Sequence, residues 1–378
     1  MPSPSVPEQR DKRDGREHAF GEALAGRLVL VTGADGFIGS HLTEALIHLG
    51  CDVHAFVRAT SSGALHNLAD VRSQLTVHHG DLADHHAVAA AIGAVAGASR
   101  PPYVFHLAAQ AHVGESWHRP YETLDANVLG TLNLLQSIVA AGLECQMIDV
   151  AGSSEEYGNV DPARRTQYRF DGASHVTLDE RSPINPTSIY ATSKVATDFL
   201  ARNFHDAYGL PTVVTRMFNN YGPRQNPRYI TGTIITQALT RDRVELGNLE
   251  PTRDFCYCSD GVRGHLAAAV HGTPGSVYCY GSGEAVSIGD WARLILAIGE
   301  EEGHWTGREV VSVPQRLRPG SSDVTALKVG HERLTTESGW KAIVGAKEGL
   351  RRTIAWYAEH PERWVGRIDW SPTEATTL

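Results

Sequence analysis

The sequence predicts an α/β protein, a doubly wound parallel sheet followed by a smaller C-terminal lobe. Up to about residue 217, short runs of β-branched residues alternate with helical segments. Strands that alternate with helices form right-handed crossovers, and these build a parallel sheet covered on both faces. Beyond about residue 219 the alternation loosens into segments rich in Gly, Pro and Asn. We therefore expect a second, smaller lobe there.

The elements of the first unit follow one another in a regular order. The patterns predict strands at 28–32, 52–57, 75–81, 103–109, 145–154 and 211–217, and helices at 39–50, 122–142 and about 187–208. We expect the strand at 276–281 to return to the same sheet. The predicted division is a mobile leader at 1–24, a main domain at 25–217 to which 255–282 returns, a lobe at 218–254 and 283–361, a lid-like insertion without regular structure at 158–182, and a tail at 362–378.

Composition and charge argue against several classes of protein. Hydrophobic residues make up 42% of the chain and charged residues 20%, as in ordinary globular proteins. The net charge of −9 argues against nucleic acid or an anionic membrane as the main partner. No apolar run approaches the roughly 20 residues that cross a bilayer, and the first residues lack the hydrophobic stretch of a signal peptide. We predict neither nucleic acid nor membrane among the partners.

The cysteines indicate a reducing compartment. There are five, an odd number at scattered positions, and Cys256 with Cys258 forms a lone CxC without the second pair of a zinc site. The histidine pairs at 78–79 and 85–86 point to two sides of a strand or turn, which favours solvated surface over metal binding. We predict free thiols, a cytoplasmic location and no bound metal.

A glycine-rich turn follows the first strand. Gly33, Gly36 and Gly39 allow a tight turn, close approach of a pyrophosphate, and packing of the next helix on the sheet. The free amide groups at the start of that helix, which include those of Phe37 and Ile38, favour phosphate. Such turns also occur as plain packing devices, but between two strands this one predicts a Rossmann-like dinucleotide site.

The second strand bears on the choice of cofactor. It ends at Arg58 and is followed by Thr and Ser residues, without the carboxylate that would bind a free ribose 2′-hydroxyl. We therefore predict NADP, with NAD possible. The alternative is that Arg58 is a solvated charge or stacks on adenine.

The stretch AGSSEEYG (151–158) places two hydroxyls and two carboxylates at the end of a buried strand. Carboxylates are costly there unless they are paired or used. Further along, Tyr190 and Lys194 are four residues apart on one face of a helix. Only five lysines occur in the chain, so a lysine at this place is informative. Its ammonium would lower the pKa of the tyrosine and let the phenol act as a base.

Several motifs occur in order: the glycine turn, GDL (80–82), HLAA (106–109), GSSEEYG, YxxxK and RMFNNYGP (216–223). With them the sequence resembles the extended short-chain dehydrogenase/reductase family over roughly residues 27–358. The resemblance implies an enzyme that acts on nucleotide-diphosphate sugars with a tightly held nicotinamide cofactor. It assigns catalysis to Ser153, Tyr190 and Lys194, and implies further cofactor contacts from Asp81, Leu82, Leu107, Ala108, Ala109, Asn127 and Phe218.

Glu155 makes the sequence resemble the 4,6-dehydratases of this family more than the epimerases. Family epimerases usually lack a carboxylate two residues after the catalytic Ser or Thr, whereas the dehydratases carry one. Its implied role is to remove the C5 proton and to help expel the C6 hydroxyl as water. Ser154 matches the serine of enzymes that act on GDP-mannose, where those that act on dTDP-glucose have Asp. The segments at 108–116 and 246–255 are also similar to the GDP-mannose branch.

The resemblance also implies substrate contacts, from Ser116, Ser154, Asn219, Asn220, Arg253 and Arg318. Alternatives stay open for some of them. The two arginines could form ordinary salt bridges, Ser116 could contact only the adjacent turn, and Asn127 could hold backbone near the nicotinamide. We expect Glu156 to be a surface carboxylate or part of a local structural pair.

The chain departs from the family pattern at three places. Tyr157 and Tyr190 are 33 positions apart, which is longer than usual, Ile189 replaces a proline, and Gly232-Thr233 stands where Arg and Lys are usual. These changes bear on the nucleotide and sugar rather than on the chemistry.

The prediction is thus an NADP-dependent nucleotide-sugar 4,6-dehydratase, most similar to the GDP-mannose enzymes. The alternatives are a 4-epimerase or epimerase/reductase on the same Ser-Tyr-Lys set, and a non-catalytic NADP-sensing protein. From the family we also expect a homodimer or tetramer that pairs through the helix near 121–141 and the Tyr190 helix. The apolar residues of the first of these helices fit packing within one chain equally well.

Overall fold

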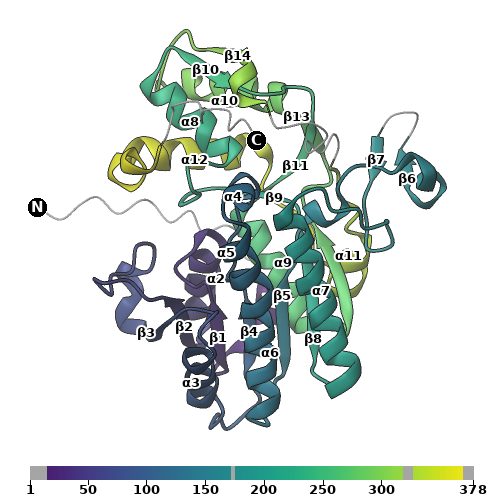
Figure 1. Ribbon diagram of the computed structural model, residues 1–378. Coiled ribbons are helices and arrows are strands. Elements are labelled where there is room, and N and C mark those ends of the chain that lie inside the picture. Colours follow the sequence, from purple (N-terminus) through teal and green to yellow (C-terminus); the bar gives the residue numbers. More distant parts are fainter. Residues whose placement is uncertain (1–14, 172–174, 318–326, 369–378) are drawn as a thin grey trace, which may run out of the picture.

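A seven-stranded parallel sheet forms the centre of the computed structural model, which describes residues 15–171, 175–317 and 327–368 (Figure 1). The strand order is β12-β8-β5-β4-β1-β2-β3, so the chain starts in the middle and winds outward in both directions. The bounds are β1 (Leu28–Thr32), β2 (Asp52–Arg58), β3 (Leu75–Gly80), β4 (Tyr103–His106), β5 (Met147–Ala151), β8 (Thr212–Met217) and β12 (Ser276–Tyr280). The predicted fold class is confirmed.

Helices cover both faces of this sheet. On one face lie α2 (Phe37–His48) and α9 (Cys258–His271), with α1 (Gly15–Leu24) packed against α9. On the other face lie α3 (His85–Val95), α6 (Gly130–Ala140) and α7 (Ile189–Tyr208) (Figure 1). Val29 and Val31 of β1 enter the first core and Leu30 enters the second, because successive strand side chains point to opposite faces.

The helix predicted at 122–142 forms as a continuous run of three segments. These are α5 (Pro120–Leu124), a π-helical turn at Asp125–Leu129, and α6. A π turn inserts one residue into the helix and is often found at functional sites. Here it carries Asn127, one of the predicted cofactor residues. The short helix α4 (Val113–His118) precedes this run.

The smaller lobe lies beyond the carboxyl ends of the strands (Figure 1). Its helices are α8 (Ile230–Thr240), α10 (Ile288–Glu301) and α12 (Ala346–Glu359). Its strands pair as β10 (Arg243–Leu246) with β14 (Glu309–Ser312), and as β11 (Thr252–Tyr257) between β9 (Asn219–Tyr221) and β13 (Ala285–Ser287). The helix α11 (Glu332–Ser338) packs beside α9 and β12.

The two predicted end segments are shorter than expected. Phe20 and Leu24 of α1 are buried in the core, so the structured chain begins before residue 25. At the other end, 3₁₀ turns at Pro361–Arg363 and Val365–Arg367 flank Trp364, which is buried and donates its indole N–H to the Tyr357 carbonyl at 2.7 Å. Both ends are held by one or two buried apolar side chains, Phe20 and Leu24 at one end and Trp364 at the other. So few apolar residues produce no periodic pattern from which the sequence could predict an ordered segment.

The insertion at 158–182 contains regular structure, contrary to expectation. A 3₁₀ turn at Pro162–Gln167 leads into β6 (Arg169–Asp171), which pairs antiparallel with β7 (His175–Thr177). Leu178 then forms a parallel bridge with Val329. Tyr168, Val176 and Leu178 pack with Tyr157 and Phe218 in a third apolar cluster. The insertion is therefore tied to both the main domain and the lobe.

Two features are absent from the part of the chain that the structure describes. None of the helices in that part of the chain combines the length and apolar character needed to span a membrane. Nor do three or more His, Cys, Asp or Glu side chains gather there in a way that could hold a metal ion.

Candidate active site

The candidate catalytic residues meet where β5 ends. The predicted strand 145–154 stops at Ala151, and Ser153 begins a 3₁₀ turn at Ser154–Tyr157. The Ser153 hydroxyl accepts the Glu155 amide N–H at 3.2 Å, while the Ser153 amide donates to Oε1 of Glu156 at 2.7 Å. This reciprocal capping box fixes the turn that carries both glutamates.

Tyr190 reaches the same place from α7. Ser188 caps this helix by accepting the Ala191 amide at 3.0 Å. The Tyr190 phenol is buried near the Ser153 hydroxyl. Burial raises the pKa of Tyr190, the Ser153 hydroxyl lowers it, and the negative charge of Glu155 raises it. The pKa of Tyr190 is raised on balance, contrary to the lowering that the sequence led us to expect from Lys194. Ser153, Glu155 and Tyr190 therefore act on one another within one site.

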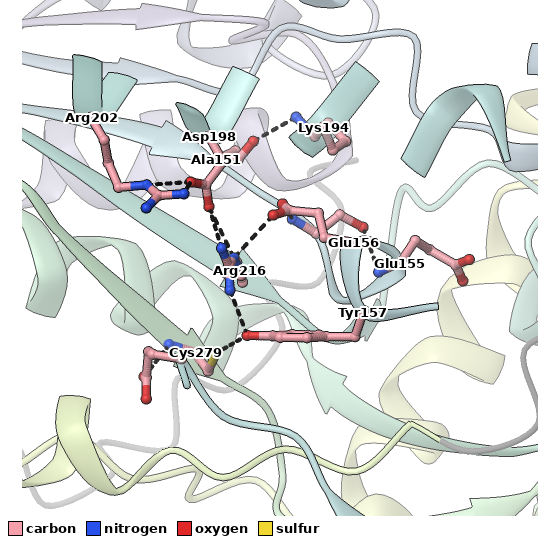
Figure 2. A network of polar contacts seen from close by, with 11 residues as sticks. Ala151, Glu155, Glu156, Tyr157, Lys194, Asp198, Arg202, Arg216 and Cys279 are labelled. Atoms are coloured by element: carbon pink, nitrogen blue, oxygen red, sulfur yellow. Dashed lines mark hydrogen bonds and ion pairs between the residues drawn. The ribbon is translucent and has the colours of Figure 1, made fainter. Parts of the chain in front are cut away.

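Lys194 lies one turn further along α7 and is also buried. Its ammonium donates to the Ala151 carbonyl at 2.5 Å (Figure 2). Burial lowers the pKa of Lys194 to about 8, and the Glu156 carboxylate opposes this shift. The lysine thus titrates close to neutrality, where small changes in its surroundings alter its charge.

The two adjacent glutamates have different environments. Glu155 is 8% exposed, and its carboxyl group points away from the polar network around Arg216 (Figure 2). Glu156 is fully buried, and its Oε2 lies 3.0 Å from Nε of Arg216. Side chains that follow each other in a 3₁₀ turn point about 120° apart. The expectation of a surface Glu156 is therefore wrong, and the alternative of a structural pair holds.

The glycine turn has the shape of a dinucleotide cradle. Gly33 has φ +69°, and a Cβ there would lie 2.7 Å from backbone atoms of Ala108. A Cβ on Gly39 would lie 2.1 Å from the Gly33 carbonyl oxygen. The N-cap residue of α2 is Gly36, which has no side chain to cap the helix. It therefore leaves the backbone amides of Phe37 and Ile38 at the helix start uncapped. These residues fit a pyrophosphate at the helix N-terminus.

The second and third strands place Arg58 beside Asp81. Nε of Arg58 lies 4.0 Å from Oδ2 of Asp81, and the two side chains are 73% and 52% exposed. Leu82 follows and is buried. Leu107 and Ala108 continue from β4, and their amides donate to the Thr32 carbonyl and hydroxyl at 3.2 Å and 3.3 Å. Ala109 is the next residue of this loop.

Asn127 and Ser116 brace the walls of the site. Asn127 accepts the Gln110 amide at 2.7 Å and donates to the Gln110 carbonyl at 3.0 Å and to Ser193 at 2.8 Å. The fully buried Ser116 donates to Val113 at 2.7 Å and accepts the Tyr190 amide at 3.2 Å. Both geometries fit the alternatives in which these residues hold backbone. Direct contact of Ser116 with a sugar, or of Asn127 with a cofactor, stays a prediction.

The predicted substrate residues lie on the lobe side. Phe218 is buried before β9, which carries Asn219 and Asn220. Within the described part of the chain, the buried Oδ1 atoms of both asparagines have no hydrogen-bond partner. Arg253 of β11 is buried and donates to the Thr252 carbonyl at 2.9 Å. Ser154 is buried in the 3₁₀ turn. Arg318 lies outside the described residues.

The structure explains one departure from the family pattern. A Cβ on Gly232 would lie 2.5 Å from the Tyr357 hydroxyl and 2.9 Å from Cα of Pro227. Helix α12 therefore fills the space in which a side chain at 232 would extend. An arginine there, which the resemblance expects, could not be accommodated without moving backbone.

Two residues near the site were not recognised from the sequence. The Tyr229 hydroxyl bridges the lobes by donating to the Ala111 carbonyl at 2.9 Å, and its charge state affects the pKa of Tyr190. His106 lies buried between the Thr32 hydroxyl, at 2.7 Å, and the Thr131 hydroxyl, at 2.9 Å. Burial lowers the pKa of His106 to about 3, so it stays neutral. The HLAA motif contained this histidine without indicating its partners.

Comparison with known proteins is consistent with this site. The family model described as GDP-mannose 4,6 dehydratase matches residues 30–353. A GDP-mannose 4,6-dehydratase of Sordaria araneosa is 32% identical over 283 residues, which cover 73% of this chain and 49% of that protein. A dTDP-glucose 4,6-dehydratase of Streptomyces griseus is 32% identical over 343 residues, covering 89% and 95%. The crystal structure of a double mutant of a Streptomyces venezuelae dTDP-glucose 4,6-dehydratase, with NAD and DAU bound, matches with a TM-score of 0.75 and 27% identity, covering 90% and 99%.

The fold and the site together define the class of protein, an NAD(P)-dependent nucleotide-sugar 4,6-dehydratase, which is a hydro-lyase. Its relatives divide between enzymes of GDP-mannose and of dTDP-glucose. The chain belongs to the extended short-chain dehydrogenase/reductase family of nucleotide-sugar dehydratases and epimerases. The predictions of family and enzyme class are confirmed.

Proposed function

We propose that this chain converts GDP-mannose into its 4-keto-6-deoxy sugar. The observation that carries the 4,6-dehydratase chemistry is the placement of Glu155, a buried carboxylate on the turn that Ser153 begins, whose charge acts on Tyr190. A 4-epimerase needs the serine, tyrosine and lysine of this set but no carboxylate in that position. Glu155 therefore supports elimination over epimerisation.

The roles of the residues follow from their chemistry. A nicotinamide held by the glycine turn would supply the acceptor for the hydride that leaves C4 and the donor of the hydride that C6 gains. Tyr190 removes the proton of the C4 hydroxyl, Ser153 donates a hydrogen bond to that oxygen, and the charge of Lys194 favours the phenolate. Glu155 then takes the C5 proton, which the 4-keto group acidifies, and passes it to the C6 hydroxyl, which leaves as water. The proton removed by Tyr190 balances the one that C5 regains, so the sugar loses one water and the cofactor is unchanged.

The choice of GDP-mannose is supported by the family model and by Ser154 at the position where the dTDP-glucose branch has Asp. Because the space beside Gly232 is filled, the arginine that the resemblance expects at this position cannot contribute a positive charge to substrate binding. Recognition of the diphosphate therefore depends more on Arg253 and Arg318, since Arg suits bidentate contact with phosphate.

A comparison of substrates and one variant tests the proposal. Purified protein is incubated with GDP-mannose, dTDP-glucose and UDP-glucose, and the products are analysed by mass spectrometry. We expect the GDP sugar to lose one water. Glu155→Gln should bind sugar and cofactor normally but lower turnover about a hundredfold or more, as expected on removal of a general base. The control is Glu348→Gln, which alters an exposed carboxylate paired with Arg352 at 2.7 Å.

Each outcome has a distinct meaning. Preference for dTDP-glucose would contradict the nucleotide assignment and leave the dehydratase. Products of unchanged mass would point to an epimerase. Turnover like that of the unsubstituted enzyme in Glu155→Gln would overturn the role of this carboxylate.

For the cofactor we propose NADP. Arg58 is the cation at the end of β2, where a ribose 2′-phosphate would lie. Among the described residues its exposed guanidinium is paired with one carboxylate, Asp81, loosely at 4.0 Å. A phosphate could compete with this weak pair, because exposed ion pairs are worth about 0–1 kcal/mol.

We also propose a cytoplasmic homodimer. Large apolar side chains are exposed on neighbouring helices, namely Trp117 of α4, Tyr121 and Leu124 of α5, and Phe199 of α7. Helices α4 and α5 both pack against α7 (Figure 1). Such a patch marks an interaction surface, and a two-fold axis through it would bury the same residues on both subunits. The five free thiols fit a reducing compartment.

A further inference from the structure

Four charged side chains, one of them the catalytic candidate Lys194, are buried together beside Ser153. They are Glu156, Lys194, Asp198 and Arg216 (Figure 2). Buried charges carry a high desolvation cost, so each one needs a partner. Arg216 is the centre of the cluster. It donates to Asp198 Oδ2 from Nε at 2.9 Å and from Nη2 at 2.8 Å, and to the Tyr157 hydroxyl from Nη1 at 3.0 Å.

Asp198 is shared between two arginines, Arg216 and Arg202. It receives these hydrogen bonds and a further ion pair from Arg202 at 2.6 Å. Glu156 Oε2 lies 3.0 Å from Arg216 Nε, but that N–H is directed at Asp198. Among the described residues, no directed hydrogen bond reaches Oε2 of Glu156. Glu156 thus supplies the second negative charge beside the two arginines, and its Oε1 is left to bond elsewhere.

The other neighbours of Glu156 are catalytic residues. Its Oε1 accepts the amide N–H of Ser153 at 2.7 Å. Its charge also acts on Lys194, where it offsets the effect of burial. Burial in turn raises the pKa of Glu156 to about 7, with Arg216 lowering it and Asp198 raising it.

We propose that Glu156 is a positioning residue of the dehydratase, which holds the backbone of Ser153 by a hydrogen bond and adds a buried negative charge to the cluster that contains the Lys194 ammonium. It acts through these two residues rather than on the sugar. The effect on turnover rests on the proposed function, whereas the effect on Lys194 does not. Nothing in the role of Glu155 requires this second carboxylate.

The direction of the pH effect follows from the groups around Glu156. Arg216 faces it from β8, Lys194 and Asp198 from α7, and Tyr157 follows it on the same turn, where its hydroxyl meets Cys279 of β12 at 3.1 Å. Among these groups the Lys194 ammonium is the one that turns neutral in the mildly alkaline range. Without the charge of Glu156, the pKa of Lys194 falls further. The enzyme should then lose activity at a lower alkaline pH.

Two variants separate the two roles. Glu156→Gln keeps an oxygen that can accept the Ser153 amide and removes the charge. Glu156→Asp keeps the charge and is too short to reach the amide. Glu180→Gln is the matched control, because this partly buried carboxylate accepts the Cys279 amide at 2.8 Å and lies outside the catalytic set.

The first measurement needs no substrate. With only five lysines in the chain, NMR of protein labelled with ¹³C-lysine can follow each side chain through a pH titration, and Lys194→Arg assigns the signal. We expect the pKa of Lys194 to fall by about one pH unit in Glu156→Gln and to stay unchanged in Glu156→Asp and Glu180→Gln. An unchanged titration in folded Glu156→Gln would overturn the charge role, whatever the enzyme's substrate.

The second measurement is kcat against pH. Glu156→Gln should retain kcat near pH 6–7 and lose it at a lower alkaline pH than the unsubstituted enzyme. Glu156→Asp should lower kcat about tenfold at every pH, because a buried amide loses its acceptor, while KM and cofactor affinity stay the same. If Glu156→Gln does not fold, Glu156→Asp decides alone, and unchanged kcat there would overturn the proposal. Failure of the dehydratase assignment would appear instead as no turnover in any variant, with the lysine titration still interpretable.

Discussion

At the scale of single residues, Arg58 makes the cofactor proposal testable. A charge-assisted contact with a 2′-phosphate contributes about 1.5–3 kcal/mol. Arg58→Ala should therefore weaken NADP binding about tenfold to a hundredfold and leave NAD binding nearly unchanged, as measured by calorimetry on cofactor-free protein. Arg293→Ala is the control, since this exposed arginine pairs with Asp290 at 2.6 Å in the distant lobe. Tighter binding of NAD than NADP by the unsubstituted protein would contradict the assignment.

Adjacent residues of one type can have unrelated roles. The position of Glu155 relative to the serine and tyrosine motifs predicts a catalytic role for it from the sequence alone. Glu156 could not be identified in the same way, because its partners Arg216 and Lys194 come from β8 and α7. Burial and pairing of a carboxylate depend on segments that are distant in the chain.

At the scale of elements, the β1–α2 turn requires glycine at position 33 for two reasons, a positive φ and close contact with the backbone of Ala108. Gly142, in the turn after α6, is a useful comparison because it has φ +58° but open space around it. Gly142→Ala should cost about 1 kcal/mol of unfolding free energy from the left-handed conformation. Gly33→Ala should cost about 1–3 kcal/mol more, because its Cβ overpacks against Ala108.

Urea unfolding and cofactor binding check this pair of variants. Only Gly33→Ala should also weaken binding of the dinucleotide, because the turn that approaches the pyrophosphate must shift. Equal stability of the two variants, with normal cofactor affinity in both, would show that the close approach at Gly33 has no consequence.

The turn and the insertion differ in how well their sequences predict them. The glycine turn can be predicted from residue type alone, because few residues other than glycine tolerate a positive φ. The insertion at 158–182 has no periodic pattern, yet it folds as a hairpin. Tyr168 and Leu178 fasten it to the cluster around Phe218. Isolated apolar anchors of this kind become visible only when their packing partners are known.

At the scale of the whole molecule, the exposed helices predict an association that can be measured. Sedimentation at micromolar concentration should give twice the mass of one chain. Tyr121→Glu with Phe199→Glu should give the mass of one chain, because two charges would be buried in the interface. Tyr121 is 80% exposed in the single chain, so its substitution should leave the fold intact.

Ile343→Glu serves as the control for this experiment. Ile343 is an exposed apolar residue that follows α11, and its amide donates to Asp260 of α9, a helix on the opposite face of the sheet from α7. This variant should sediment like the unsubstituted protein. A single-chain mass for the unsubstituted protein would contradict the homodimer.

The sequence by itself determined the alternation of strands and helices in the main domain, the glycine turn and the spacing that predicts catalytic roles for Ser153, Glu155, Tyr190 and Lys194. Local periodicity and residue spacing are sufficient for these features, and parallel strands bring their carboxyl ends to one edge of the sheet. Only the tertiary structure decided that Glu156 is buried against Arg216, that Tyr357 fills the space beside Gly232, and that Ser116 holds the Tyr190 amide. Each of these contacts joins segments far apart in the chain, and their proximity depends on packing that no local pattern encodes.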